Sequence, residues 1–118
     1  MANPKEKKSG KYIPERGDLV WLNFNPISGH EQAGKRPALV LSPLKYNERV
    51  GLALCCPITS RVKGYPFEVS LDQTKSIKGV VLSDQIKSLD WRARNAQFIE
   101  RATSQVVTQT LSKIRLLL

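Results

Sequence analysis

Apolar and polar residues alternate along this chain in the manner of many short strands followed by one helix. The predicted strands are bounded by glycine, proline or asparagine and are rich in β-branched and aromatic residues. They cover residues 18–24, 37–42, 51–57, 67–72, 79–82, 85–89 and 97–99. Residues 43–49, between the second and third strands, predict a short helix or a turn.

The spacing of apolar residues changes near the end of the chain. From Thr103 onward, four of them recur at helical spacing: Val107, Leu111, Ile114 and Leu118. Thr103 or Ser104 can cap this helix. Because strands and helices do not alternate, the pattern favours a small, strongly curved antiparallel sheet or barrel with the helix packed on it.

The length and charge of the chain narrow the picture. A chain of 118 residues suits one compact domain, and its formal net charge of +9 attracts nucleic acid, anionic lipid or an acidic protein segment. A basic surface that only aids solubility is the alternative. Residues 1–11 are a polar, basic tail that we expect to be solvated, which leaves residues 12–118 as the domain.

Cysteine content and hydropathy indicate the compartment. The adjacent Cys55 and Cys56 point to opposite faces of a strand, so they read as buried thiols of a cytosolic protein. No apolar run approaches the ~20 residues needed to cross a bilayer, and residues 1–11 lack a signal sequence. We therefore expect a soluble cytoplasmic protein with no membrane partner.

The sequence offers little for metal or two-histidine chemistry. It has a single histidine, no second cysteine pair and scattered acidic residues, so neither a zinc site nor a two-metal centre is expected. No phosphate-binding glycine loop or hydrolase elbow occurs either. If the chain cleaves RNA, we expect it to use the substrate's own 2′-hydroxyl, without a metal or cofactor.

Residues 29–37 form a dense polar loop between two apolar strands. His30 or Glu31 could exchange a proton, and Arg36 can donate two hydrogen bonds to one phosphate. Pro37 biases Arg36 toward extended backbone, which helps to fix its side chain. The alternative is a solvated loop in which Arg36 merely pairs with a carboxylate.

Further polar residues stand beside other predicted strands. Thr59 could hold a phosphate oxygen or simply satisfy backbone groups, and Asp84 could be a base or a turn residue. Arg92 and Arg94 closely follow Trp91, an arrangement that suits phosphate contact beside a stacked base, although Trp91 itself is interpreted as a core residue.

Five motifs occur together in the order that is found in the MazF/PemK-like toxins. They occupy residues 17–21, 29–42, 57–59, 63–67 and 84–85, and the resemblance extends over residues 12–118. The resemblance implies a mainly β fold, an SH3-like (CcdB/PemK-type) barrel with a C-terminal helix, and a homodimer that binds RNA in grooves near its interface. It also implies a metal-independent, ribosome-independent and sequence-specific endoribonuclease that cuts single-stranded mRNA and leaves 2′,3′-cyclic phosphate and 5′-hydroxyl ends. A cognate antitoxin with an acidic, disordered tail would neutralise it.

The resemblance assigns roles by position. Arg36 and Thr59 match the pair assigned to catalysis in MazF-like members, Glu31 matches a carboxylate implicated in some, and His30 and Asp84 match residues of PemK-like members. Leu82 stands where PemK-like members have an arginine, so Asp84 is assigned a positioning role. The general base stays open among His30, Glu31 and Asp84. The expected RNA contacts are Lys35, Lys63, Gln85, Arg92 and Arg94.

Two other functions are compatible with such a fold. A gyrase poison resembling CcdB would act through a C-terminal helix that bears a tryptophan, and this chain has no tryptophan after Trp91. A barrel that binds RNA without cleaving it would be supported by charge and fold alone.

Overall fold

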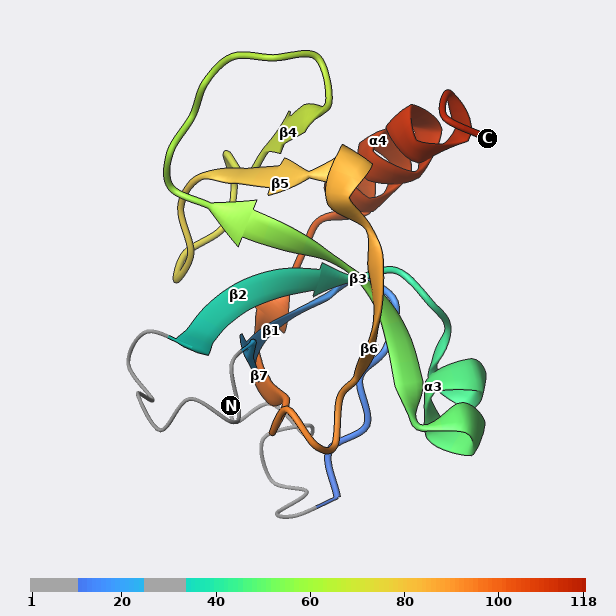
Figure 1. Cartoon of the computed structure of the whole chain (residues 1–118). Helices are drawn as coiled ribbons and strands as arrows, with labels where there is room; N and C mark the ends of the chain where they lie inside the picture. The colour runs from blue at the N-terminus through green and yellow to red at the C-terminus, as the bar shows by residue number, and fades with distance from the viewer. Residues whose placement is uncertain (1–10, 25–33) are drawn as a thin grey trace.

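A computed structural model of the chain describes residues 11–24 and 34–118 (Figure 1). Each predicted strand overlaps an observed one, and the segment that predicted a short helix or turn is helical. In chain order the elements are β1 (Asp18–Asn23), β2 (Lys35–Val40), α3 (Leu44–Val50), β3 (Leu52–Thr59), β4 (Glu68–Ser70), β5 (Val80–Leu82), the 3-10 helix η1 (Ser83–Gln85), β6 (Lys87–Asp90), β7 (Gln97–Arg101) and α4 (Ser104–Arg115).

The strands form one antiparallel sheet in the order β4-β5-β3-β2-β1-β7, and β6 also pairs with β3. The long strand β3 is central, because β2 lies along one edge while β6 and β5 share the other. In Figure 1 the sheet curves strongly and α4 lies over its β4–β5 end. The prediction of a mainly β fold with a C-terminal helix is confirmed. The arrangement is barrel-like, although the path of described strands from β4 to β7 does not close.

The sheet carries a hydrophobic core on each face. Leu19 and Leu39, which pair across β1 and β2, belong to one core, while their neighbours Val20 and Ala38 belong to the other. The two cysteines follow the same rule, because Cys56 packs in the first core and Cys55 in the second. Both are free and buried, as the sequence predicted.

Helix α4 covers the first core. The Thr103 side chain accepts a hydrogen bond from the Val106 amide and caps the helix, while Val106, Thr110 and Ile114 are buried beneath it. The helical repeat was expected to reach Leu118. The helix instead ends at Arg115, and Leu118 is 96% exposed. No helix in the described part of the chain is long and apolar enough to cross a membrane.

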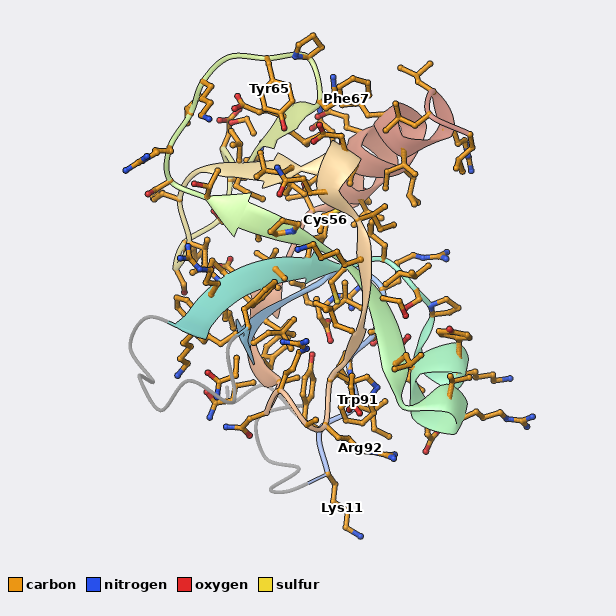
Figure 2. The ribbon with its side chains drawn as sticks, in the orientation of Figure 1. Lys11, Cys56, Tyr65, Phe67, Trp91 and Arg92 are labelled. Carbon is orange, nitrogen blue, oxygen red and sulfur yellow. The ribbon has the colours of Figure 1, made fainter. Side chains whose placement is uncertain are left out.

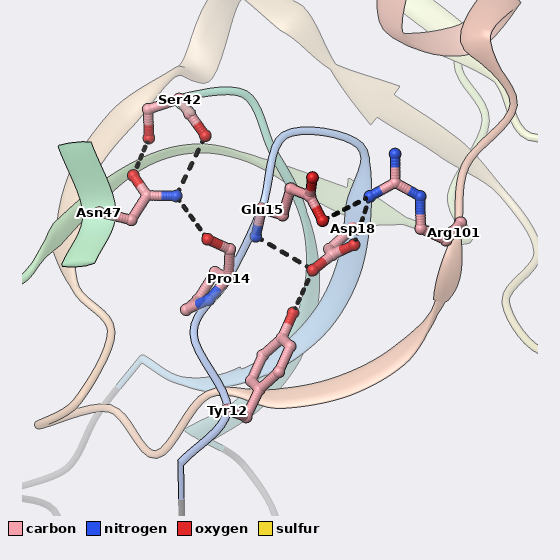
Figure 3. Close-up of polar contacts among 7 residues, drawn as sticks. All are labelled: Tyr12, Pro14, Glu15, Asp18, Ser42, Asn47 and Arg101. Carbon is pink, nitrogen blue, oxygen red and sulfur yellow. Dashed lines mark hydrogen bonds and ion pairs between the residues drawn. The ribbon is translucent and has the colours of Figure 1, made fainter. Parts of the chain in front are cut away.

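The segment before β1 is fixed by two polar clusters (Figure 3). The Asn47 amide donates to the carbonyl oxygens of Pro14 and Ser42 at 2.8 and 3.0 Å. The buried Asp18 carboxylate accepts from the Tyr12 hydroxyl at 2.5 Å and from Arg101 Nη1 at 2.9 Å. These contacts join the N-terminal segment to α3 and β7.

Candidate active site

Arg36 and Thr59 lie at the ends of two neighbouring strands, β2 and β3. The last registered pair of β2 and β3 is Ala38 with Pro57, and Arg36 and Thr59 each stand two residues beyond it. Since every second residue of a strand points to the same face, both side chains emerge on one side of the sheet. The structure therefore places the two residues that the sequence put at the centre of the site on one face of neighbouring strands.

Arg36 has no acceptor among the residues that the structure describes. The residue is exposed, and no atom of residues 11–24 or 34–118 accepts a hydrogen bond or ion pair from its guanidinium. The alternative in which Arg36 pairs with a carboxylate finds no such partner in the described chain. A guanidinium in this setting can bind a phosphate through two parallel hydrogen bonds.

Thr59 is half-buried and has a local partner. Its Oγ1 accepts a hydrogen bond from the Arg61 amide at 3.1 Å, which closes a turn at the end of β3. Thr59 thus satisfies a backbone group, as the alternative interpretation expected. Its hydroxyl proton can still be donated to a ligand, because a hydroxyl both accepts and donates.

Lys35 points away from Arg36. It precedes Arg36 in β2 and so lies on the opposite face, where its Nζ is 5.7 Å from the centroid of the Trp21 ring. A cavity of about 230 Å³ opens on this side, between Trp21, Lys35, Arg94 and Gln97. The Lys35 and Arg36 side chains therefore point to opposite faces of β2.

Asp84 lies away from Arg36 and Thr59. The β3–β5 register places Val80 opposite Thr59, and Asp84 follows four residues later in η1. In Figure 1, η1 is on the α4 side of the sheet, whereas β3 ends on the other side. Within one chain, the structure therefore does not join Asp84 to the Arg36–Thr59 pair.

Asp84 has a partner that the sequence did not reveal. The Tyr65 hydroxyl donates a hydrogen bond to Asp84 Oδ1 at 2.7 Å. This bond is the main cause that raises the pKa of Tyr65 above its ordinary value, because the bond needs the hydroxyl proton. The sequence marked Tyr65 only as part of a turn, since its partner is 19 residues away.

The segment around Lys63 is held by Glu68 of β4. The Glu68 carboxylate accepts hydrogen bonds from the amides of Lys63 and Gly64, both at 2.9 Å. Lys113 of α4 also donates to the Pro66 carbonyl. The Lys63 side chain is exposed, so a polyanion can reach it.

Arg92 and Arg94 differ in their surroundings. The exposed Arg92 lies over the Trp91 ring at 4.7 Å, and Trp91 is buried with its indole N–H bonded to the Asn47 carbonyl, which confirms it as a core residue. Figure 2 shows Trp91 and Arg92 at the opposite end of the molecule from Tyr65 and Phe67. Arg94 is half-buried and donates from Nη1 to two backbone carbonyls, those of Asn23 and Phe24.

Some of the predicted residues stay untested by this geometry. His30 and Glu31 lie outside the described residues. Among residues that are described, no group of three or more histidines, cysteines or acids is placed to hold a metal ion. Burial raises the pKa of both Cys55 and Cys56 to about 12, so neither thiol is poised as a nucleophile.

Comparison with known proteins gives a consistent result. Residues 15–118 match the family described as the PemK-like, MazF-like toxin of type II toxin–antitoxin systems. The chain is 55% identical over 86 residues to the endoribonuclease toxin MazF of Escherichia coli strain K12, which covers 73% of this chain and 77% of that protein. It is 39% identical over 107 residues to the endoribonuclease toxin ChpB of the same strain, with 86% and 90% covered.

Solved structures resemble the fold over nearly the whole chain. MazF from Deinococcus radiodurans (form I) superposes with a TM-score of 0.82 at 52% identity, covering 91% of this chain and 97% of that one. The MazE–MazF structure (form II) from that organism gives a TM-score of 0.81 at 48% identity, with 91% and 96% covered.

Proposed function

Since the chain belongs to the family of PemK-like, MazF-like toxins of type II toxin–antitoxin systems, we propose that it is an endoribonuclease that cleaves single-stranded mRNA. The observation that carries this proposal is that Arg36 and Thr59 share one face of β2 and β3, and that the Arg36 guanidinium has no acceptor among the described residues. The relatives named above are endoribonucleases, and the net charge of +9 favours a polyanionic substrate.

The reaction we propose needs no metal. The RNA 2′-oxygen attacks the adjacent phosphorus, the bond from phosphorus to the 5′-oxygen breaks, and a 2′,3′-cyclic phosphate and a 5′-hydroxyl result. A base removes the 2′-hydroxyl proton, and an acid returns a proton to the departing 5′-oxygen. The atoms balance without water or any other reactant.

Each residue has a proposed part in this reaction. Arg36 donates to the non-bridging phosphoryl oxygens, whose negative charge grows in the transition state, and Thr59 adds one hydroxyl donor. His30 and Glu31 are the candidate base and acid. Asp84, held by Tyr65, positions the RNA together with Gln85 and Lys63.

The proposed partners follow from the positive charge of the chain and from its protein family. We propose that residues 12–118 act as one cytoplasmic toxin domain that forms a homodimer and binds sequence-specifically to RNA. An antitoxin with an acidic, disordered tail would compete for the same basic surface. The MazE–MazF structure from Deinococcus radiodurans supports a proteinaceous antitoxin as the class of partner.

One experiment separates an enzyme from a binding protein. Purified protein is incubated with single-stranded RNA of mixed sequence in EDTA, and the new ends are mapped chemically. We expect cuts at a short recurring sequence with cyclic-phosphate and 5′-hydroxyl ends. Intact RNA would contradict the nuclease function, and cleavage that EDTA abolishes would contradict the metal-free mechanism.

A further inference from the structure

The turn between β6 and β7 carries an arginine that is bonded to another part of the sheet. Arg94 Nη1 donates to the carbonyl oxygens of Asn23 and Phe24 at 3.0 and 3.1 Å. The Asn23 amide donates in return to the Arg94 carbonyl at 2.9 Å. Three hydrogen bonds thus fix the end of β1 to residue 94, and the guanidinium also lies 5.9 Å from the Phe24 ring.

The end of β1 pairs in turn with the beginning of β2. The Phe24 amide donates to the Gly34 carbonyl at 2.6 Å, and Asn23 is registered with Lys35. The next pair in the ladder is Leu22 with Arg36. The backbone of Arg36 is therefore held by the strand segment that Arg94 fixes.

We propose that Arg94 is a positioning residue for Arg36, and that it acts through the backbone of β1 rather than by binding the RNA phosphates. Backbone carbonyls that lack a strand partner must be satisfied in another way, and a guanidinium can serve two of them with one planar group. A lysine offers a single charge on a flexible stem and holds two carbonyls less firmly.

The turn itself is built to hold Arg94 in place. The Asp90 carbonyl accepts from the Arg94 amide at 3.1 Å, and the Asp90 carboxylate accepts from the Ala93 amide at 2.9 Å. Asn95 closes the turn in the left-handed region at a φ of 53°. Since both ends of the contact are fixed, Arg94 can transmit a definite position to β1.

This inference rests on the proposed role of Arg36 in RNA cleavage, so its test includes a measurement that does not depend on activity. Amide hydrogen exchange is recorded for Arg94→Gln, Arg94→Lys and Arg49→Gln, where Arg49 is exposed on α3. We expect exchange of the Phe24 amide to become at least about tenfold faster in Arg94→Gln, less so in Arg94→Lys, and to be unchanged in Arg49→Gln. An unchanged exchange of the buried Leu39 amide shows that the fold is intact.

The kinetic part separates positioning from phosphate contact. With an RNA that the wild-type protein cuts, Arg94→Gln should lower kcat by about tenfold or more while KM and the salt dependence of RNA binding stay as in the wild type. A phosphate ligand would instead reduce the slope of log K against log salt by about one. That result, or wild-type exchange at Phe24, would overturn the inference. A wild-type protein that cuts no RNA would refute the proposed function alone, because the exchange measurement would still stand.

Discussion

Gly79 and Thr59 approach so closely across the β3–β5 pair that a Cβ on Gly79 would lie 2.1 Å from the Thr59 carbonyl oxygen. Gly79 also has a φ of +124°, which side chains disfavour. The backbone of Thr59 can therefore keep its place at the end of β3 only if residue 79 has no side chain.

Gly79→Ala should move the backbone of Thr59 and lower RNA cleavage by about tenfold or more, with a loss of stability of about 2 kcal/mol. Gly64→Ala is the matched control, since Gly64 has a φ of +84° but no atom within 4 Å of an added Cβ. Gly64→Ala should lower the free energy of unfolding by only about 1 kcal/mol. Cleavage rates and urea unfolding check both, and equal effects of the two substitutions would contradict this account.

The Tyr65–Asp84 hydrogen bond predicts a titration. The raised pKa of Tyr65 means that this bond contributes to stability below the ordinary tyrosine pKa of about 10 and is lost as pH rises through the raised value. Asp84→Asn should lower the pKa of Tyr65 toward the ordinary value. NMR titration of the tyrosine rings measures the pKa of Tyr65 in both proteins. An unchanged Tyr65 pKa in Asp84→Asn would show that the bond does not form in solution.

The Tyr12–Asp18 bond predicts a loss of stability. Asp18 is fully buried, and a charged acceptor deprived of one of its donors costs about 2 kcal/mol. Tyr12→Phe should therefore lower the free energy of unfolding in urea by about that amount. Tyr46→Phe, on the exposed side of α3, should leave it within about 0.5 kcal/mol. If both variants were as stable as the wild type, the Tyr12–Asp18 bond would contribute nothing to the free energy of unfolding.

The buried thiols predict an alkaline decline in stability. Burial raises the pKa of Cys55 and Cys56 from 9.0 to about 12, and the negative charge of Asp84 adds to the effect at Cys56. Because the unfolded chain loses these protons first, the free energy of unfolding should fall as pH rises from about 9 toward 12. Labelling by a thiol reagent at pH 8 should be slow in the native protein and rapid in urea. Rapid native labelling would show that the thiols are accessible.

Short apolar runs bounded by turn residues were enough to predict most of the strands, because a strand that is buried on both faces is apolar along its length. The ends of the strands were less well predicted. β2 begins at Lys35 rather than residue 37, and β3 continues to Thr59 rather than stopping at residue 57. These end residues are polar and exposed or half-buried, and what places them in strands is pairing with β1 and β5.

The candidate site was predicted in part. Resemblance of motifs proposed Arg36 and Thr59 as site residues, and the register of β2 and β3 places them on one face of neighbouring strands. The resemblance did not reveal the hydrogen bond from Tyr65 to Asp84 or the one from Arg94 to the Asn23 carbonyl. The partners in these two bonds are 19 and 71 residues apart in the sequence. Contacts of this kind depend on the tertiary fold and leave no periodicity in the sequence.

In the reaction that we propose, Arg36 stabilises the transition state of metal-free RNA cleavage. The most direct test of this role is the single-turnover cleavage rate in EDTA of Arg36→Ala beside the wild type, at RNA concentrations that saturate both. We expect the rate of Arg36→Ala to be lower by about 10²-fold or more, the effect of losing one transition-state donor. A rate close to that of the wild-type protein would contradict it.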